Sequence, residues 1–278
     1  TSPGTSTGVV EVTYPDGSKN TVDVTVNVSK LSDEYDVSAT EIEVNQNDPV
    51  SNDDLKAKVT ATSKVGNVSG TDKIAKVEPK VQVSTAAYGE TNIEATVTFK
   101  DGTTKDVTIP LKVKDVTPPT IQVPTNGQNW DLIAVEGQDP NIDVTSEDNT
   151  GGSGVKSTTV TGLPDFLAYD EATKTIKFKT GVTQVPSLPE GTDVQPHNIT
   201  IEVEDNAGNK TSTSVTITVK SMTTKYDATP NLEKQTVSYG ATPDAATSVN
   251  TSGLPEGTKY KWTTTPDTNT PGEKDGVV

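Results

Sequence analysis

Apolar and polar residues alternate along much of this chain of 278 residues, and a period of two is typical of β-strands with one buried face. The alternation is clearest in residues 22–28, where every second residue is Val. An Asp-Gly pair precedes this stretch at residues 16–17, and a second pair precedes a similar stretch at residues 101–102. Asp-Gly between alternating segments favours a hairpin with a two-residue type I′ turn, in which both central residues take a positive φ. The pattern therefore predicts two β-hairpins.

The two predicted hairpins are copies of one sequence motif. A shift of 85 residues without a gap superimposes Val12, Tyr14, Asp16, Gly17, Val22, Val24, Val26 and Val28 on Val97, Phe99, Asp101, Gly102, Val107, Ile109, Leu111 and Val113. A second shift, of 268 residues, superimposes residues 3–10 on residues 271–278. Repetition of this kind indicates a modular array. We therefore expect residues 1–30 and 221–278 to be complementary parts of one kind of module.

Several short motifs lie near the carboxyl end of the chain. They are Lys225–Asp227, Gly240–Ala245, Leu254–Trp262 and Thr270–Gly272. When the segment Val12–Ser18 from the amino end is placed after these motifs, the combined set resembles the Rib domain of Gram-positive surface proteins. Residues 31–113 lack the Leu-Pro-x-Gly-Thr element and the Trp, so we term them the Rib-like module. The resemblance implies tandem immunoglobulin-like β modules that stack end to end as the extracellular stalk of an adhesin anchored to the cell wall.

Residues 114–220 have a different pattern. Two consecutive Pro residues at positions 118–119 restrict the backbone and indicate a module boundary. Strand-like stretches follow at residues 142–146, 157–161, 175–178, 198–204 and 212–220. This spacing predicts a β-sandwich, and the loop motifs at residues 146–150, 162–170 and 203–209 resemble bacterial immunoglobulin-like or cadherin-like modules.

The expected architecture is therefore all-β: tandem immunoglobulin-like β-sandwich modules in an elongated rod. Its parts are the C-terminal part of a Rib domain (1–30), the Rib-like module (31–113), an immunoglobulin-like or cadherin-like sandwich (114–220) and the N-terminal part of a Rib domain (221–278). Helix signals are scarce. Residues 52–58 could cap and open one or two helical turns, or they could be a loop that enters a strand.

Composition excludes several classes of function. The chain has 48 Thr and 35 Val but no Arg or Cys, and its net charge is −16. This negative charge disfavours binding to nucleic acid and to anionic membrane surfaces. No apolar run is long enough for membrane insertion. The absence of Cys removes disulfides, thiol nucleophiles and thiolate metal ligands. The single His, His197, has no Ser or Cys motif beside it, so we expect no catalytic residues and no enzyme.

Paired carboxylates for glycoside hydrolysis are the remaining catalytic possibility. Asp165 and Asp170 flank Phe166 and Tyr169, and aromatic residues beside acids could suit a sugar. We interpret this stretch instead as a turn at a strand end whose rings fill the core.

Calcium is the metal that the sequence favours. Ca²⁺ binds about six to eight oxygen atoms from carboxylates, amide groups and the backbone, and such groups cluster in the predicted loops. The candidate ligands are Asp115, Glu147, Asp148, Asn149 and Asp205. In cadherin-like modules, acidic loops of this kind gather around calcium at the joint between modules. The alternative is that these residues form ordinary hairpin turns.

The preferred function is a spacer that holds a distal binding domain away from the cell wall. In the alternative, the 114–220 module itself binds a host glycan or extracellular protein through Phe166, Tyr169 and the loop Gly151–Gly154, in a calcium-dependent way if the acidic loops bind the ion. Burial of both rings would favour the spacer. A further expected partner is a second copy of the chain, because the tail, through Trp262 and Val278, could pair head to tail with Val9–Val28 of the next copy.

Overall fold

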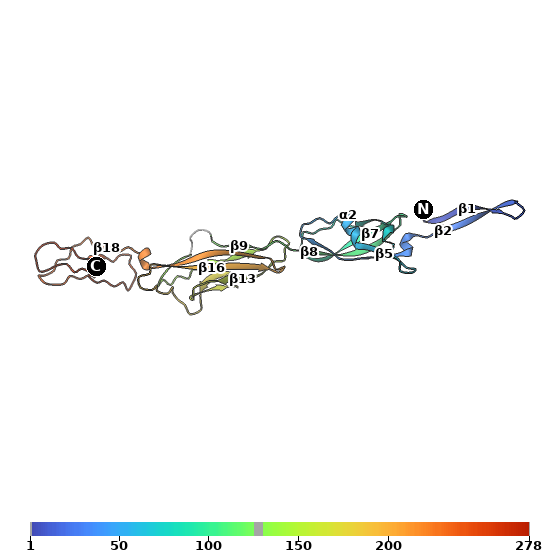
Figure 1. The fold of residues 1–278 in the computed structure, drawn as a ribbon. Helices are drawn as coiled ribbons and strands as arrows, with labels where there is room; N and C mark the ends of the chain where they lie inside the picture. The colour runs from blue at the N-terminus through green and yellow to red at the C-terminus, as the bar shows by residue number, and fades with distance from the viewer. Residues whose placement is uncertain (1, 125–129, 278) are drawn as a thin grey trace. The chain divides into compact units, whose positions relative to one another are not determined.

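A computed structural model describes residues 2–124 and 130–277, and strands dominate its regular structure (Figure 1). The all-β class is thereby confirmed. The described chain forms two compact units. One comprises Thr1–Ile121, Ser146–Thr158 and Glu202–Thr211, and the other comprises Gln122–Thr145, Thr159–Ile201 and Ser212–Val278. No helix in the described residues is long and apolar enough to cross a membrane.

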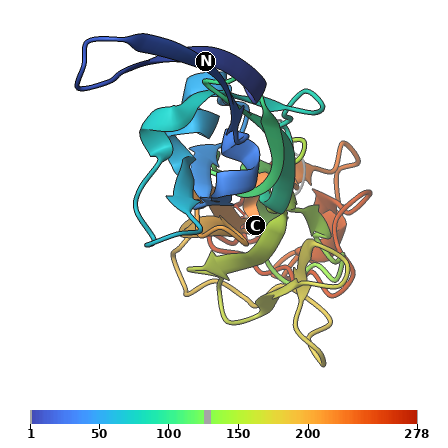
Figure 2. The ribbon, with the colours of Figure 1, turned by 90° about the vertical axis from the view of Figure 1, so that its right-hand side faces the viewer.

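The first predicted hairpin consists of β1 (Gly4–Thr13) and β2 (Lys19–Val28), which pair antiparallel along their whole length (Figures 1 and 2). Its turn is not the predicted type I′, because Gly17 takes a positive φ of 86° and Asp16 does not. The Tyr14 N–H donates to the Ser18 carbonyl and the Gly17 N–H donates to the Tyr14 carbonyl, both at 2.9 Å. A type I turn followed by a left-handed Gly explains this pattern, and it requires only the Gly to leave the usual region.

The Rib-like module contains the second predicted hairpin. Its elements are α1 (Leu31–Glu34), β3 (Tyr35–Ala39), β4 (Ile42–Asn45), α2 (Asn52–Lys58), β5 (Val59–Ser63), a 3₁₀ turn (Thr71–Lys73), β6 (Ile74–Pro79), β7 (Gly89–Phe99) and β8 (Thr104–Lys114). The hairpin of β7 and β8 lies at the centre of a four-stranded sheet, with β4 parallel to β8 and β6 antiparallel to β7. A second sheet pairs β3 with β5.

Of the two alternatives for residues 52–58, a helix or a loop, the structure has the helix, α2. The Ser51 hydroxyl accepts a hydrogen bond from the Asp54 N–H, and the Asp54 carboxylate accepts one from the Ser51 N–H, so both halves of a capping box are present. Leu55 from this helix is buried in the core of the module with Phe99, Ile109 and Leu111. The helix is therefore stabilised by its cap and by packing rather than by length.

Residues 114–220 form β9 (Thr120–Gln122), β10 (Asp131–Ile133), β11 (Ile142–Asp143), β12 (Thr145–Glu147), β13 (Val155–Thr161), β14 (Leu167–Asp170), β15 (Thr175–Phe178), β16 (Val194–Asp205) and β17 (Lys210–Lys220). The sheets have the strand orders β10-β17-β16-β13, β11-β15-β14 and β12-β9. Every strand stretch that the sequence predicted here is present, and alternate residues such as Ile199, Ile201 and Val203 are buried.

The tail has less regular structure. Its elements are two 3₁₀ turns (Met222–Thr224 and Ala246–Ser248) and the short pair β18 (Thr229–Pro230) and β19 (Val249–Asn250). Thr264 forms an isolated antiparallel bridge with Val277. Most of its described residues are exposed, with Pro243 and Ala245 among the few buried ones. These residues do not form a complete β-sandwich by themselves.

Candidate metal centre

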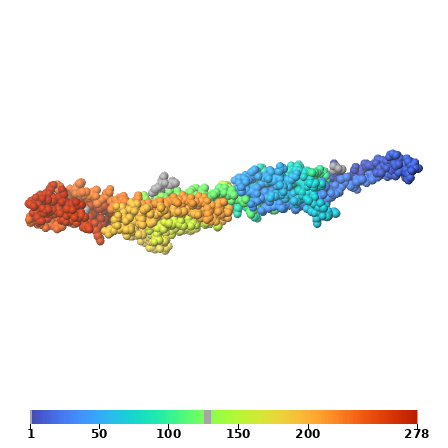
Figure 3. Space-filling view, viewed as in Figure 1, coloured from blue at the N-terminus to red at the C-terminus, as the bar shows by residue number. Residues whose placement is uncertain are grey.

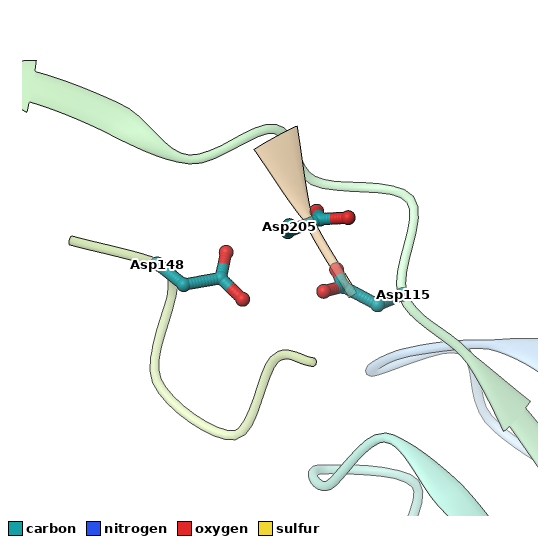
Figure 4. Close-up of side chains that lie close together, drawn as sticks. All are labelled: Asp115, Asp148 and Asp205. Atoms are coloured by element: carbon teal, nitrogen blue, oxygen red, sulfur yellow. The ribbon is translucent and has the colours of Figure 1, made fainter. Parts of the chain in front are cut away.

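Three of the predicted ligands converge in the first unit. One carboxylate oxygen from each of Asp115, Asp148 and Asp205 lies within 4.8 Å of the others (Figure 4). Asp115 follows β8, Asp148 follows β12 and Asp205 ends β16. Two of them are nearly inaccessible, since Asp115 is 5% exposed and Asp205 is 0% exposed. Three strand ends thus bring acidic side chains to one point.

Hydrogen bonds fix the orientation of each carboxylate. Asp115 accepts from the N–H groups of Thr117 at 3.1 Å and Ser153 at 2.7 Å. Asp148 Oδ2 accepts from the Gly154 N–H at 2.6 Å. Asp205 accepts from the Asn209 N–H and from the Asn209 Nδ2, both at 2.8 Å. Hydrogen bonds in these loops therefore hold the three carboxylates in orientations in which they face one another.

The electrostatics of the cluster favour a cation. Burial would raise the pKa of Asp115, but hydrogen bonds from the backbone of Ser153 and Thr117 and from the Ser153 hydroxyl outweigh it, so this pKa stays below its ordinary value. Within the described ranges, no Lys forms an ion pair with Asp115, Asp148 or Asp205. Close like charges at low exposure repel one another unless a counter-charge or a proton is present.

The other two predicted ligands behave differently. The Glu147 side chain is exposed and lies outside the cluster, although its carbonyl accepts from the Thr120 hydroxyl at 3.1 Å. Asn149 lies beside the cluster, and its Oδ1 is buried without a hydrogen-bond partner. A Cβ on Gly152 would approach Asn149 Oδ1 to 2.6 Å and Asp148 Oδ2 to 2.7 Å, so both oxygens face the space that this Gly leaves open. Hard oxygens around such a space fit Ca²⁺.

Sequence reasoning missed Gln46, which holds the loop that carries Asp148 and Asn149. Gln46 is 8% exposed, and its Nε2 donates to the carbonyls of Ala86 at 2.7 Å and Thr150 at 3.0 Å. Its Oε1 accepts from Asn149 Nδ2 at 2.6 Å. The bonds to Thr150 and Asn149 connect the Rib-like module to the 148–152 loop, and the bond to Ala86 fixes the Gln46 side chain within its own module. The partners of Gln46 are distant from it in the sequence, and no local motif marks Gln46, so these contacts become visible only in the three-dimensional structure.

A second bridge connects the same segments through the backbone. The Tyr88 N–H donates to the Gly151 carbonyl at 2.8 Å. Gly151 has a φ of 76°, and a Cβ at this position would lie 2.4 Å from the Ala86 carbonyl oxygen. Only Gly allows this close approach. The loop Gly151–Gly154, a candidate ligand-binding surface in the sequence, therefore takes part in a contact within the unit.

The other candidate binding and catalytic residues lie in β14 and the turn before it. Phe166 is buried and contacts Phe178 with a ring-centroid distance of 6.4 Å, whereas Tyr169 is half-buried. Phe166 therefore lies in the core, as the sequence predicted, whereas Tyr169 is only partly in it, so the condition that both rings be buried is met by Phe166 alone. Lys177, with the N–H groups of Thr173 and Ala172, lowers the pKa of Asp170, which is the opposite of what a general acid needs.

Comparison with known proteins gives one family. The sequence profile described as "Rib domain" matches residues 1–30, 32–115 and 224–278, which is well over half of the chain. The chain is 29% identical over 286 residues to the C protein alpha-antigen of Streptococcus agalactiae serotype Ia, covering 98% of this chain and 24% of that protein. It thus spans about a quarter of the length of this relative.

Similarity to solved structures is low. The protocadherin GammaB4 extracellular domain superimposes with a TM-score of 0.40 at 12% identity, covering 80% of this chain and 43% of the other. The fibronectin(III)-like modules of CbhA from Clostridium thermocellum give a TM-score of 0.25 at 15% identity, covering 73% of this chain and 96% of the other. These scores are too low to support a conclusion about function.

Proposed function

This chain belongs to the Rib domain family, and we propose that it is part of the stalk of a surface adhesin anchored to the cell wall, which holds a distal binding domain away from the cell. The observation that carries this proposal is repetition. The β1–β2 and β7–β8 hairpins are copies of one motif, and the Rib profile matches three separate segments. A repeated structural module is suited to spanning distance.

The contact between the Rib-like module and the 148–152 loop supports the same role. Gln46 makes two hydrogen bonds to this loop and a third to Ala86 of its own module, and the Tyr88 backbone adds one more bond to the loop. A spacer gains reach when its modules do not bend freely at their joints, because a flexible chain has a shorter mean end-to-end distance than a stiff one.

We further propose that Asp115, Asp148 and Asp205, with Asn149 beside them, bind Ca²⁺. The ion would offset the repulsion among three carboxylates and would tie the ends of β8, β12 and β16 together. Its role would be structural, since it would stiffen the connection between the Rib-like module and the strands that follow.

Calorimetry of the full chain with Ca²⁺ and with a chelator tests the metal site. At a Ca²⁺ concentration about 100 times the dissociation constant, mass action should add roughly 2.7 kcal/mol to the stability of the unit that binds it. Asp205→Asn should abolish this gain. Glu147→Gln is the matched control, because its side chain lies outside the cluster, and it should keep the gain. Identical transitions with and without Ca²⁺ would reject the site.

An array of host glycans and extracellular-matrix proteins tests the spacer against the alternative that residues 114–220 bind a host molecule. If the chain is a spacer, the full chain should show no saturable binding to any member of the array. Binding that is lost in a Tyr169→Ala variant would favour the alternative, since Tyr169 is the more exposed of the two candidate rings.

A further inference from the structure

The Asn149 side chain lies between the acidic cluster and the Rib-like module. Its Oδ1 is buried without a hydrogen-bond partner, whereas its Nδ2 donates to Gln46 Oε1 at 2.6 Å. A buried polar atom without a partner destabilises a fold, so native proteins seldom keep one unless it has a task such as binding an ion. The two ends of this amide group therefore differ: one is bonded to the Rib-like module and the other is free.

The free end of the amide lies beside one of the clustered carboxylates. A Cβ on Gly152 would lie 2.6 Å from Asn149 Oδ1 and 2.7 Å from Asp148 Oδ2, so both oxygens border the space that this Gly leaves open. The next residue, Ser153, donates its N–H to Asp115 Oδ2 at 2.7 Å. The loop thus folds around the cluster and brings a neutral amide oxygen to it. Amide oxygens are ordinary ligands of Ca²⁺.

Hydrogen bonding determines which end of the Asn149 amide faces the cluster. The oxygen and the nitrogen of such an amide have nearly the same shape, so their partners decide the orientation. Gln46 Nε2 donates to the carbonyls of Ala86 at 2.7 Å and Thr150 at 3.0 Å. Carbonyls only accept, so Gln46 must turn its nitrogen to them and its oxygen to Asn149. Asn149 must then turn its nitrogen to Gln46, which leaves its oxygen on the side of Asp148.

This orientation opposes the preference of the acidic cluster itself. Carboxylates attract hydrogen-bond donors, so an Asn149 amide without Gln46 would turn its nitrogen toward Asp148 and its oxygen away. The observed orientation instead adds an oxygen to three carboxylates, which suits a cation that binds about six to eight oxygens. Gln46 is 8% exposed, so it contributes little to the surface of the Rib-like module, which runs from blue to green in Figure 3. It is therefore placed to act on the cluster rather than on solvent.

We propose that Gln46 is a positioning residue of the Ca²⁺ site, which keeps Asn149 Oδ1 turned toward the ion. The inference rests on the proposed Ca²⁺ site. An ion at Oδ1 would polarise the amide and strengthen its hydrogen bond to Gln46, so ion binding and the contact with the 148–152 loop reinforce each other. The network lies wholly within the first unit, so it is independent of the predicted head-to-tail pairing between copies, which stays a prediction and whose Val278 lies outside the described residues.

Calorimetric titration of the full chain with Ca²⁺ tests the proposal. Gln46→Ala should weaken Ca²⁺ binding by roughly 10-fold or more, as is typical when a residue that orients a metal ligand is lost. The Gln46 side chain would not touch the ion, so this loss must pass through Asn149. Gln82→Ala is the matched control, because Gln82 is exposed in the same unit, and it should bind Ca²⁺ like the wild type.

Asn149→Asp separates the orientation of the amide from a general loosening of the loop. Both ends of an Asp side chain are oxygens, so the ligand no longer depends on Gln46 for its orientation. The double variant Q46A/N149D should therefore bind Ca²⁺ at least as tightly as N149D. Should N149D not fold, Asn149→Ala gives a second comparison, in which Q46A/N149A should bind about as tightly as N149A because no amide is left to orient.

The outcomes distinguish this inference from the metal site on which it rests. A wild-type chain that binds no Ca²⁺ would reject both. Ca²⁺ binding by the wild type with equal affinity in Q46A would keep the metal site and overturn the role of Gln46. An equal loss of affinity on adding Q46A to the wild type, to N149D and to N149A would also overturn it, since Gln46 would then act on the loop as a whole and not through the Asn149 amide.

Discussion

Replacing Gln46 by Ala tests whether the Rib-like module and the 148–152 loop act as one unit. The substitution removes three hydrogen bonds and leaves the Ala86 and Thr150 carbonyls and the Asn149 amide without partners in a partly buried place. Each such bond contributes about 0.5–1.5 kcal/mol net, and an unsatisfied buried group costs more. Q46A should therefore lower the free energy of unfolding by roughly 2–4 kcal/mol.

Urea unfolding gives the stability change, and amide hydrogen exchange locates it. The Tyr88 N–H, which donates to the Gly151 carbonyl, should exchange roughly 30-fold faster or more in Q46A if the loop opens by about 2 kcal/mol more readily. Gln82→Ala is the matched control, because Gln82 is exposed in the same unit. A loss in Q46A no larger than that in Q82A, with unchanged exchange at Tyr88, would refute the inference that Gln46 holds the two segments together.

Two further predictions concern the turn glycine and acid stability. Gly102 has a φ of 85°, so Gly102→Val should destabilise its module by about 1–3 kcal/mol in urea unfolding. Gly8 has no positive φ, so the control Gly8→Val should destabilise the protein less. Equal losses of stability would contradict the turn argument. The pKa of Asp115 lies below its ordinary value of 3.8, so its ionised form stabilises the fold above that pH, and this contribution is lost as the pH falls through the lower folded pKa. An acid titration of unfolding should therefore be less steep for Asp115→Asn, and an unchanged slope would show that Asp115 contributes nothing there.

The hairpins could be predicted from the sequence because their information is local. Val at every second position fixes which face of β2 is apolar, and the Asp-Gly pair places the turn. The turn type could not be predicted from the pair alone, since Asp-Gly suits both a two-residue turn and a type I turn that ends in a left-handed Gly. Residues 52–58 were ambiguous for a similar reason, because the Leu55 contacts that stabilise the helix come from distant strands.

The candidate metal site was predictable in part. Asp115, Asp148 and Asp205 each follow or end a strand, where acidic loop residues can meet. Glu147 is a predicted ligand because it adjoins Asp148 in the sequence. It is the last residue of β12, however, and since successive side chains of a strand point to opposite faces, the Glu147 side chain faces solvent. Gln46 could not be found, since its three partners lie 40 to 104 residues away in the sequence. Calcium binding itself stays a prediction.

Small-angle X-ray scattering of the full chain, extrapolated to zero concentration, tests the stalk most directly. A compact protein of this length has a radius of gyration of about 19 Å. A stiff row of modules of about 30–40 Å each should instead give about 35–45 Å, together with the scattering of a rod. A value near that of the compact protein would contradict the proposal that this member of the Rib family is a spacer.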